Sequence, residues 1–158
     1  MPEVLDPARE RIRQAGRRVT ALRVTLLELL QAQAHLSSEQ LQGGARERLG
    51  SISPQAVYDS LGALAEAGLI RRIEPARSPA LYELRVKDNH HHLVCRGCAR
   101  VVDVDCALGH APCLAPASDA GYLVDEAEVN YWGLCPRCRP EGGAPAGLGP
   151  APQGGRNE

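Results

Sequence analysis

The sequence gathers metal-binding side chains in the stretch HHHLVCRGCARVVDV, residues 90–104. Cys95 and Cys98 form a Cys-x-x-C pair within it, and Cys135 and Cys138 form a second pair later in the chain. Two such turns present four sulfurs about 2.3 Å from one ion, which suits tetrahedral Zn²⁺ and leaves no open position for chemistry. The alternative is two unrelated pairs of redox or core thiols. We predict a structural zinc site that clamps the last strand to a hairpin and contributes to the folding free energy.

The histidines of this stretch indicate a second kind of metal site. Side chains alternate along a strand, so His90 and His92 share a face while His91 points the other way. A hairpin that turns within the first Cys-x-x-C pair places His92 opposite Asp103 and His90 opposite Asp105. Directly paired Cβ atoms lie about 4.5–5.5 Å apart, so one cation can bridge the two strands. Two imidazoles and a carboxylate suit Fe(II), Mn(II), Zn(II) or Ni(II) rather than Cu(I).

Length and composition limit the class of protein. With 158 residues, 44% of them hydrophobic, the chain can bury a core as one domain or two small ones. No apolar run approaches the roughly 18 residues that span a bilayer, and the acidic start is unlike a signal peptide. We therefore expect a cytoplasmic protein with no membrane partner. In that reducing compartment the six cysteines are first metal ligands or redox thiols and only second a disulfide framework.

The first half of the chain predicts four helices followed by a hairpin. The helices are expected to begin at Asp6, Thr20, Ser37 and Ser53, and Ser37 and Gln40 have the spacing of a capping box. Apolar residues at helical spacing predict one buried stripe in the second helix and one in the fourth: Leu22, Leu26, Leu29 and Leu30, and Val57, Leu61, Leu64 and Ala65. LIRRIEP and ALYELRV follow as two strands. This order is that of a winged helix-turn-helix, in which residues 53–67 form the recognition helix and the hairpin forms the wing.

The second half of the chain predicts short strands and turns rather than helices. Residues 86–89 look like a hinge, and residues 90–138 are predicted to form short strands and turns that carry the metal ligands. Further strand is expected in YLVDEAEVNYWGLC, residues 122–135. Residues 139–158 are nearly all Gly, Pro and Ala, which cannot bury enough apolar area to offset the entropy of ordering, so we expect a disordered tail. The fold class is therefore α+β: a winged-helix domain over residues 1–85 and a small C-terminal α/β domain.

Charge also divides the chain near residue 86. The first part carries 12 arginines against 10 acidic residues, and the second carries 6 basic against 9 acidic residues. The positive excess lies before residue 24, where it forms either an anion-facing patch or a solvated helix face. In a winged helix the start of the recognition helix reads base edges, and basic side chains contact phosphates. The candidates for DNA contact are Arg18, Arg23, Gln55, Tyr58, Arg71, Arg72 and Arg77.

Several motifs agree in order and spacing with one known family. RVTALRVTLLELL, SPQAVYDSLGALAEAGLI, LYEL, NHHHLVCRGC and CPRC, which together cover about residues 10–138, resemble the ferric uptake regulator (Fur) family. The resemblance implies a homodimeric, metal-dependent repressor that binds a palindromic double-stranded DNA operator. It also implies a winged helix followed by a dimerisation domain over residues 90–138, and neither enzymatic activity nor a small-molecule substrate.

Carried over residue by residue, the resemblance places the structural zinc on the four paired cysteines. It places a regulatory cation on His35, Glu83, His90, His92 and Asp103. Such a cation joins ligands on both sides of the hinge, and so selects the arrangement in which both recognition helices fit one operator.

Asp103 favours one branch of the family. The iron-sensing branch usually has Glu at this position, whereas the branch that senses peroxide through bound Fe(II) has Asp. In that branch peroxide oxidises a ligand histidine, here His35 or His90, and loss of the metal derepresses the target genes. HHHLVCRGCARVVDVDCALGHAPCL and DEAEVNYWGLCP also resemble Fur-type regulators associated with catalase-peroxidase genes.

Other readings remain open at this point. Asn89 replaces a common family ligand, which argues against a third metal site built on His91 and Asp105. Cys106 and Cys113 are either ordinary buried thiols or a redox pair whose disulfide disables repression. The regulatory metal is Fe²⁺ or Mn²⁺, with Zn²⁺ or Ni²⁺ as alternatives in an uptake regulator that responds to zinc, nickel or iron levels. Outside this class, the same ligands fit a non-haem iron enzyme or a metal-storage protein.

Overall fold

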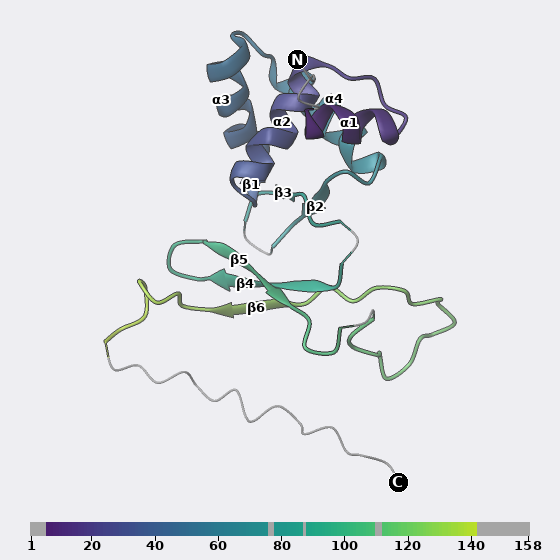
Figure 1. The fold of residues 1–158 in the computed structure, drawn as a ribbon. Helices are drawn as coiled ribbons and strands as arrows, with labels where there is room; N and C mark the ends of the chain where they lie inside the picture. Colours follow the sequence, from purple (N-terminus) through teal and green to yellow (C-terminus); the bar gives the residue numbers. More distant parts are fainter. Residues whose placement is uncertain (1–5, 76–77, 87, 110–111, 142–158) are drawn as a thin grey trace.

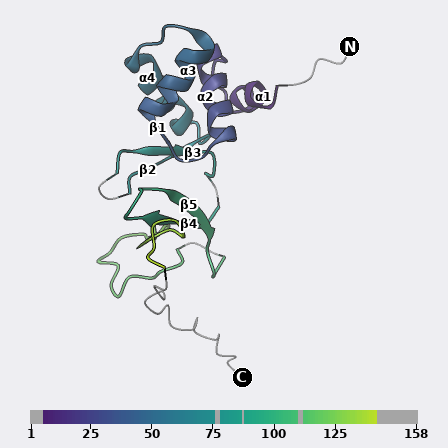
Figure 2. The same ribbon diagram turned by 90° about the vertical axis from the view of Figure 1, so that its left-hand side faces the viewer.

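The computed structural model describes residues 6–75, 78–86, 88–109 and 112–141. In this part of the chain, helices cover one side of a small three-stranded sheet, and a second three-stranded sheet lies on its other side (Figure 1). The view turned by 90° shows the same order of layers (Figure 2). The predicted α+β fold is confirmed. None of the described helices is long and apolar enough to cross a membrane.

The helices begin at the capping residues that the sequence predicts. They are α1 (Pro7–Gln14), α2 (Ala21–Ala32), α3 (Ser38–Leu49) and α4 (Pro54–Glu66). At the start of α3 the Ser37 hydroxyl accepts a hydrogen bond from the Gln40 N–H at 3.2 Å, and the Gln40 side-chain oxygen accepts one from the Ser37 N–H at 2.9 Å. The predicted capping box is therefore present.

The apolar faces of the four helices share one core. On α4 the predicted stripe is largely confirmed, because Val57, Leu61 and Leu64 are buried. On α2 the buried set is wider than the predicted stripe and includes Val24 and Leu27. The reason is that α1, α3 and α4 all pack against α2, so more than one of its faces is covered.

The first sheet contains the predicted hairpin of β2 (Arg71–Ile73) and β3 (Leu81–Glu83), which pair antiparallel. A third strand, β1 (Leu36–Ser37), pairs with the other edge of β3 and was not predicted. A two-residue strand is too short to show an alternating pattern in the sequence. β1 nevertheless has a consequence for function, because it fixes His35, its neighbour in the chain, next to the end of β3.

The second sheet is ordered β5-β4-β6 and consists of β4 (His90–Cys95), β5 (Val101–Asp105) and β6 (Asn130–Gly133). The predicted register of the β4–β5 hairpin is confirmed: His92 pairs with Asp103 and His90 pairs with Asp105. The predicted strand YLVDEAEVNYWGLC is wrong in extent, since only β6 is strand. β6 runs parallel to β4, so a long crossover is required, and the residues before β6 provide it. The predicted tail lies, from residue 142 onward, outside the described residues.

Loss of the α3 cap should destabilise the helical core. In Ser37→Ala the Gln40 N–H loses its acceptor, and we expect the free energy of unfolding to fall by about 1 kcal/mol in urea denaturation followed by circular dichroism. Ser51→Ala is the matched control, because Ser51 is exposed and lies outside a helix cap. Equal stability of the two variants would contradict the role of the cap.

Candidate metal centres

The four paired cysteines converge at the end of the second sheet. The Sγ atoms of Cys95, Cys98, Cys135 and Cys138 all lie within 4.8 Å of one another, and the Cys98 and Cys135 sulfurs are 3.8 Å apart. Zn–S bonds of about 2.3 Å in a tetrahedron imply S–S separations of about 3.8 Å. The donor set and its spacing therefore fit a zinc ion.

The backbone around these cysteines prepares one of them as a thiolate. The N–H groups of Cys135 and Gly97 both donate to Cys95 Sγ, at 3.3 Å each. Backbone hydrogen bonds, first of all the one from Cys135, lower the pKa of Cys95 to about 6. Hydrogen bonds to the other three sulfurs, first of all to Cys135, raise the pKa of Cys138 to about 12. A divalent cation supplies the positive charge that all four thiolates need together.

Gly97 is required here by close packing. A Cβ added to it would lie 2.9 Å from Cys138 Cβ and 3.0 Å from Cys138 Sγ, so the turn or the ligand would have to move. This close approach leaves no local pattern in the sequence, because Cys138 lies far from Gly97 along the chain.

Gly97→Ala should therefore weaken the zinc site. We expect the variant to release zinc to a chromophoric chelator faster than the unmodified protein. Gly133→Ala is the control in the same sheet, since an added Cβ there meets no described atom within 4 Å. Identical release from both variants would show that the close approach of Gly97 to Cys138 is unimportant.

The second centre joins the two sheets. Glu83, at the end of β3, is fully buried, and three imidazole Nε2 atoms surround its carboxylate. His35 and His92 contact Oε2 at 3.0 and 3.1 Å, and His90 contacts Oε1 at 3.0 Å. Asp103 Oδ1 lies 2.8 Å from the His35 nitrogen, 3.5 Å from that of His92 and 3.8 Å from that of His90. Ligand atoms of His35, Glu83, His92 and Asp103 all lie within 4.8 Å of one another, and His90 joins them through its contact with Glu83.

The carboxylates and imidazoles of this cluster shift one another's pKa values. Burial acts to raise the pKa of Glu83, but hydrogen bonds from His35 and His92 and the positive charge of the imidazoles outweigh it and hold the pKa at about 2. Burial likewise acts to lower the pKa of His35, but its contacts with Glu83 and Asp103 outweigh it and raise that pKa. The carboxylates therefore attract positive charge, which either protons or a cation can provide.

The surroundings of Asp103 are explained better by a bound cation than by hydrogen bonds within the cluster. Its Oδ1 is buried and close to three ring nitrogens, yet it has no aligned hydrogen-bond donor among the described residues. Nε2 atoms and carboxylate oxygens from both sheets thus point to one place. The set is an N/O donor set, which suits first-row divalent metals.

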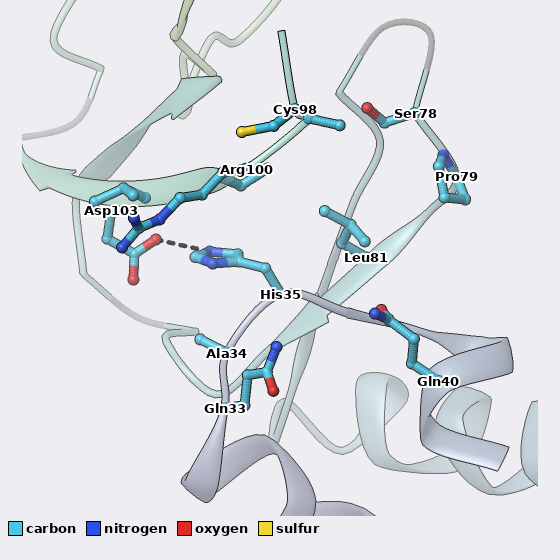
Figure 3. Close-up of a pocket in the computed structure, with 13 residues that line it drawn as sticks. Gln33, Ala34, His35, Gln40, Ser78, Pro79, Leu81, Cys98, Arg100 and Asp103 are labelled. Carbon is cyan, nitrogen blue, oxygen red and sulfur yellow. Dashed lines mark ion pairs between the residues drawn. The ribbon is translucent and has the colours of Figure 1, made fainter. Parts of the chain in front are cut away.

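The cluster borders a cavity of about 640 Å³ between the two sheets. Figure 3 shows His35 and Asp103 facing each other at its wall. Around them lie Cys98 and Arg100 from the turn between β4 and β5, Leu81 from β3, and Ser78, which precedes β3. His35 and Asp103 therefore lie where a small molecule in this cavity would first meet the cluster.

Two features of the centre were not predicted from the sequence. Asp88, which we assigned to a hinge, has its carboxylate Oδ1 2.9 Å from His90 Nδ1. This contact orients the His90 ring so that Nε2 points toward the cluster. His35 has a φ of +60°, a left-handed conformation that is uncommon for residues other than glycine. Both features depend on chain geometry that no local pattern encodes.

Arg85 connects the centre with its surroundings. Its guanidinium pairs with Asp88 and Asp105, and Nη1 lies 3.7 Å from Asp103 Oδ2. Its positive charge thus offsets the negative charge of Asp88, which precedes β4, and of Asp103 and Asp105 on β5.

Asp88 and Asp105 provide a matched pair of variants. In Asp88→Asn the orienting carboxylate of His90 is lost, and we expect Mn²⁺ binding at this centre to weaken by roughly 10- to 100-fold. In Asp105→Asn the pairing with Arg85 is lost without a change at His90, so binding should change little. Free Mn²⁺ is measured by electron paramagnetic resonance. Equal weakening in both variants would mean that the charge of Arg85, not the orientation of His90, is what matters.

The candidate redox pair lies on the other side of the second sheet. Cys106 Sγ, Cys113 Sγ and a nitrogen of His91 all lie within 4.8 Å of one another. Burial acts to raise the pKa of Cys106, but hydrogen bonds from the Leu108 and Gly109 backbone outweigh it and lower that pKa. Burial and the contact with Cys106 raise the pKa of Cys113. The structure thus brings the two thiols together with a histidine that we had not grouped with them.

The candidate DNA contacts lie mainly on the helical layer. Gln55 and Tyr58 are exposed on α4, where Gln55 donates to Asp59 and the Tyr58 hydroxyl accepts from Ser38 Oγ at 3.1 Å. Arg18 is exposed, and the Arg23 guanidinium donates a hydrogen bond to the Arg18 carbonyl oxygen at 2.7 Å.

The wing arginines are placed differently. Arg71 donates to Glu126 at 2.6 Å and so connects β2 to the crossover before β6. Arg72 is exposed and pairs with Glu74. Arg77 lies outside the described residues.

A helical domain with a small wing, whose candidate metal ligands are shared with a second sheet, is typical of a metal-responsive transcriptional regulator. The chain belongs to the ferric uptake regulator family, whose model matches residues 14–113. Its members are transcriptional regulators, which sets aside the non-haem enzyme as an alternative.

Relatives and solved structures agree with this assignment. The chain is 54% identical over 129 residues to the transcriptional regulator FurA of Mycobacterium tuberculosis, covering 82% of this chain and 88% of the relative. It is 50% identical over 121 residues to ferric uptake regulation protein 1 of Mycolicibacterium fortuitum, covering 77% of this chain and 75% of the relative. The Vibrio cholerae ferric uptake regulator has a similar fold, with a TM-score of 0.60, 25% identity and coverage of 80% and 98%. The Campylobacter jejuni peroxide stress regulator shares the fold, with a TM-score of 0.58, 23% identity and coverage of 86% and 99%.

Proposed function

We propose that this protein is a homodimeric, metal-dependent repressor that senses peroxide through Fe(II) bound at the centre between the two sheets. The residues that hold the ion are His35, Glu83, His90, His92 and Asp103. The observation that carries the proposal is the convergence of donors from both sheets on the buried Glu83 carboxylate. A cation shared in this way favours one orientation of the helical domain over others.

The coupling to DNA follows from which elements hold the ligands. His35 comes directly before β1 and the α3 cap, and Glu83 ends β3, so both are rigidly connected to the helical domain over residues 1–85. His90, His92 and Asp103 belong to the β4–β5 hairpin of the domain over residues 90–138. We propose that residues 86–89, of which residue 87 lies outside the described residues, act as a hinge between the two once the ion is lost.

Peroxide sensing is supported by Asp103 and by the cavity beside it. Bound Fe(II) would reduce peroxide and so generate an oxidant next to the ring of a ligand histidine. His35, whose ring borders the cavity, and His90 are the residues that we expect to be oxidised. An oxidised ring keeps its nitrogens but would be a much weaker metal ligand. The cation would then have fewer good donors and would be released more readily.

Dimerisation is supported by the outer face of the second sheet. Leu93, Val102, Tyr131 and Leu134 are 40–49% exposed and line one apolar groove. Large side chains exposed together mark an interaction surface. We propose that a second copy covers this face, and that zinc held by the four paired cysteines keeps the end of the sheet in shape.

The operator contacts that we propose are Gln55 on base edges, Tyr58 as an apolar or phosphate contact, and Arg18, Arg23 and Arg72 on phosphates. Arg71 would first have to leave Glu126. The net charge of −1 gives little nonspecific attraction to DNA, so the ion-organised dimer must supply the affinity for a palindromic site.

A second candidate is an iron-level-responsive uptake regulator that uses the same centre. It is favoured by the names of relatives such as ferric uptake regulation protein 1 of Mycolicibacterium fortuitum. The two candidates differ in whether peroxide acts on the iron-loaded protein.

The test compares operator binding by protein loaded with Fe(II) or with Mn(II), before and after micromolar peroxide, in a gel-shift assay. We expect peroxide to release the Fe(II) protein from DNA and to leave the Mn(II) protein bound, because Mn(II) does not reduce peroxide under these conditions. Mass spectrometry should find added oxygen on His35 or His90. Persistence of both complexes would exclude peroxide sensing at this centre and favour the iron-level regulator.

Asp103→Glu separates repression from sensing. The longer carboxylate keeps the donor type, so metal-dependent operator binding should be largely retained while the response of the Fe(II) protein to peroxide becomes weaker. An unchanged response in this variant would shift the sensing role to Cys106 and Cys113.

A further inference from the structure

His91 faces away from the centre between the sheets. It pairs with Val104 in the β4–β5 hairpin, and strand alternation turns its ring to the opposite side from His90 and His92. Although it is polar, it is only 4% exposed, and the ring of Tyr131 lies edge-on to it with centroids 6.2 Å apart. A buried imidazole on this face needs a partner other than the carboxylates of the first centre.

The partner that the structure provides is a pair of thiols. His91 Nε2 lies 3.2 Å from Cys113 Sγ, and Cys106 Sγ completes a group whose three atoms all lie within 4.8 Å of one another. Cys106 is fixed at the end of β5, because its N–H donates to the Asn89 carbonyl at 3.2 Å. Cys113 belongs to the crossover that leads to β6.

We propose that His91, Cys106 and Cys113 form a further metal site, which takes a borderline or soft cation such as Zn²⁺ or Cu⁺. Two thiolates and one imidazole are an S/N donor set that Zn²⁺ completes with a fourth ligand, and that Cu⁺ accepts with three. The set differs in kind from the N/O donors around Glu83, so the two sites select different cations. This inference does not rest on the proposed sensing of peroxide.

Binding at this site would have a local structural effect. The ion would join the central strand β4 to the start and middle of the crossover, on the face of the sheet that carries the apolar groove. The crossover contains no helix or strand among its described residues, so a cation would supply a fixed point that its own hydrogen bonds do not.

The experiment uses the full chain with zinc at the four paired cysteines and with His92→Ala and Asp103→Ala to remove the centre between the sheets. This protein is titrated anaerobically with Co²⁺ as a spectroscopic probe, and with Zn²⁺ and Cu⁺ against competing chelators. We expect one further equivalent of Co²⁺ with thiolate-to-metal charge-transfer absorption. Cys113→Ser should reduce that absorption by about half, because one of two thiolates is lost, and should weaken binding by at least an order of magnitude.

His91→Asn tests the nitrogen ligand. It should weaken binding while keeping the charge-transfer absorption of two thiolates, whereas Asp105→Asn, next to Cys106 in the chain, should bind as before. Thermal unfolding of each variant shows whether the fold is retained. Absence of the further equivalent, absence of thiolate charge transfer, or equal affinity in all variants would overturn the site. The stronger of Zn²⁺ and Cu⁺ binding identifies the preferred cation.

A second measurement does not depend on variants. Two thiols and one hydrogen peroxide give one disulfide and two waters, so oxidation of Cys106 and Cys113 can be followed by the loss of alkylatable thiol. Bound Zn²⁺ should slow this reaction several-fold. A rate that is the same with and without the added equivalent of Zn²⁺ would also overturn the proposal.

Discussion

The contact of one buried carboxylate with three imidazoles holds the two halves of this protein in their observed arrangement. Glu83 is fully buried and contacts His35, which directly precedes β1, and His90 and His92 from the second sheet. A buried charge without partners is costly, so the orientation of the sheets depends on positive charge being present between them. Several elements position the side chains of this contact. The α3 cap and β1 fix His35, and the register of the β4–β5 hairpin fixes His90 and His92.

The two faces of β4 explain how one short strand serves different chemistry. Alternation sends His90 and His92 toward carboxylates and sends His91 toward thiols. Hard and soft donors are thereby separated by the thickness of one sheet, although the residues are adjacent in the sequence. The end of the same strand contributes Cys95 to the four-cysteine cluster, so β4 takes part in every group of metal-binding side chains found among the described residues.

Much of this arrangement could be predicted from the sequence, because it depends on local patterns. Ser37 and Ser53 mark helix starts by hydrogen bonds within one turn, and the tight turn at Cys95 and Cys98 fixes the hairpin register. What escaped prediction depends on contacts between distant segments. Neither the pairing of β1 with β3, nor the approach of Gly97 to Cys138, nor the assembly of His91 with Cys113 leaves a local pattern. Asp88 was missed for a different reason: a residue that orients a ligand has no characteristic spacing of its own.

The parallel pairing of β6 with β4 affects the order in which this half of the chain can assemble. The β4–β5 hairpin joins neighbours in sequence, whereas β6 must return across the whole crossover. Closing a flexible loop of this length costs about 3 kcal/mol in chain entropy. The pairing of β6 with β4 involves four residue pairs at the edge of the sheet, which hardly offset this cost. A cation caught first by the hairpin's two cysteines would then capture Cys135 and Cys138 and draw the last strand into register. With zinc at the four cysteines, as proposed, completion of this sheet during synthesis would depend on the supply of the ion as well as on the emergence of the last strand.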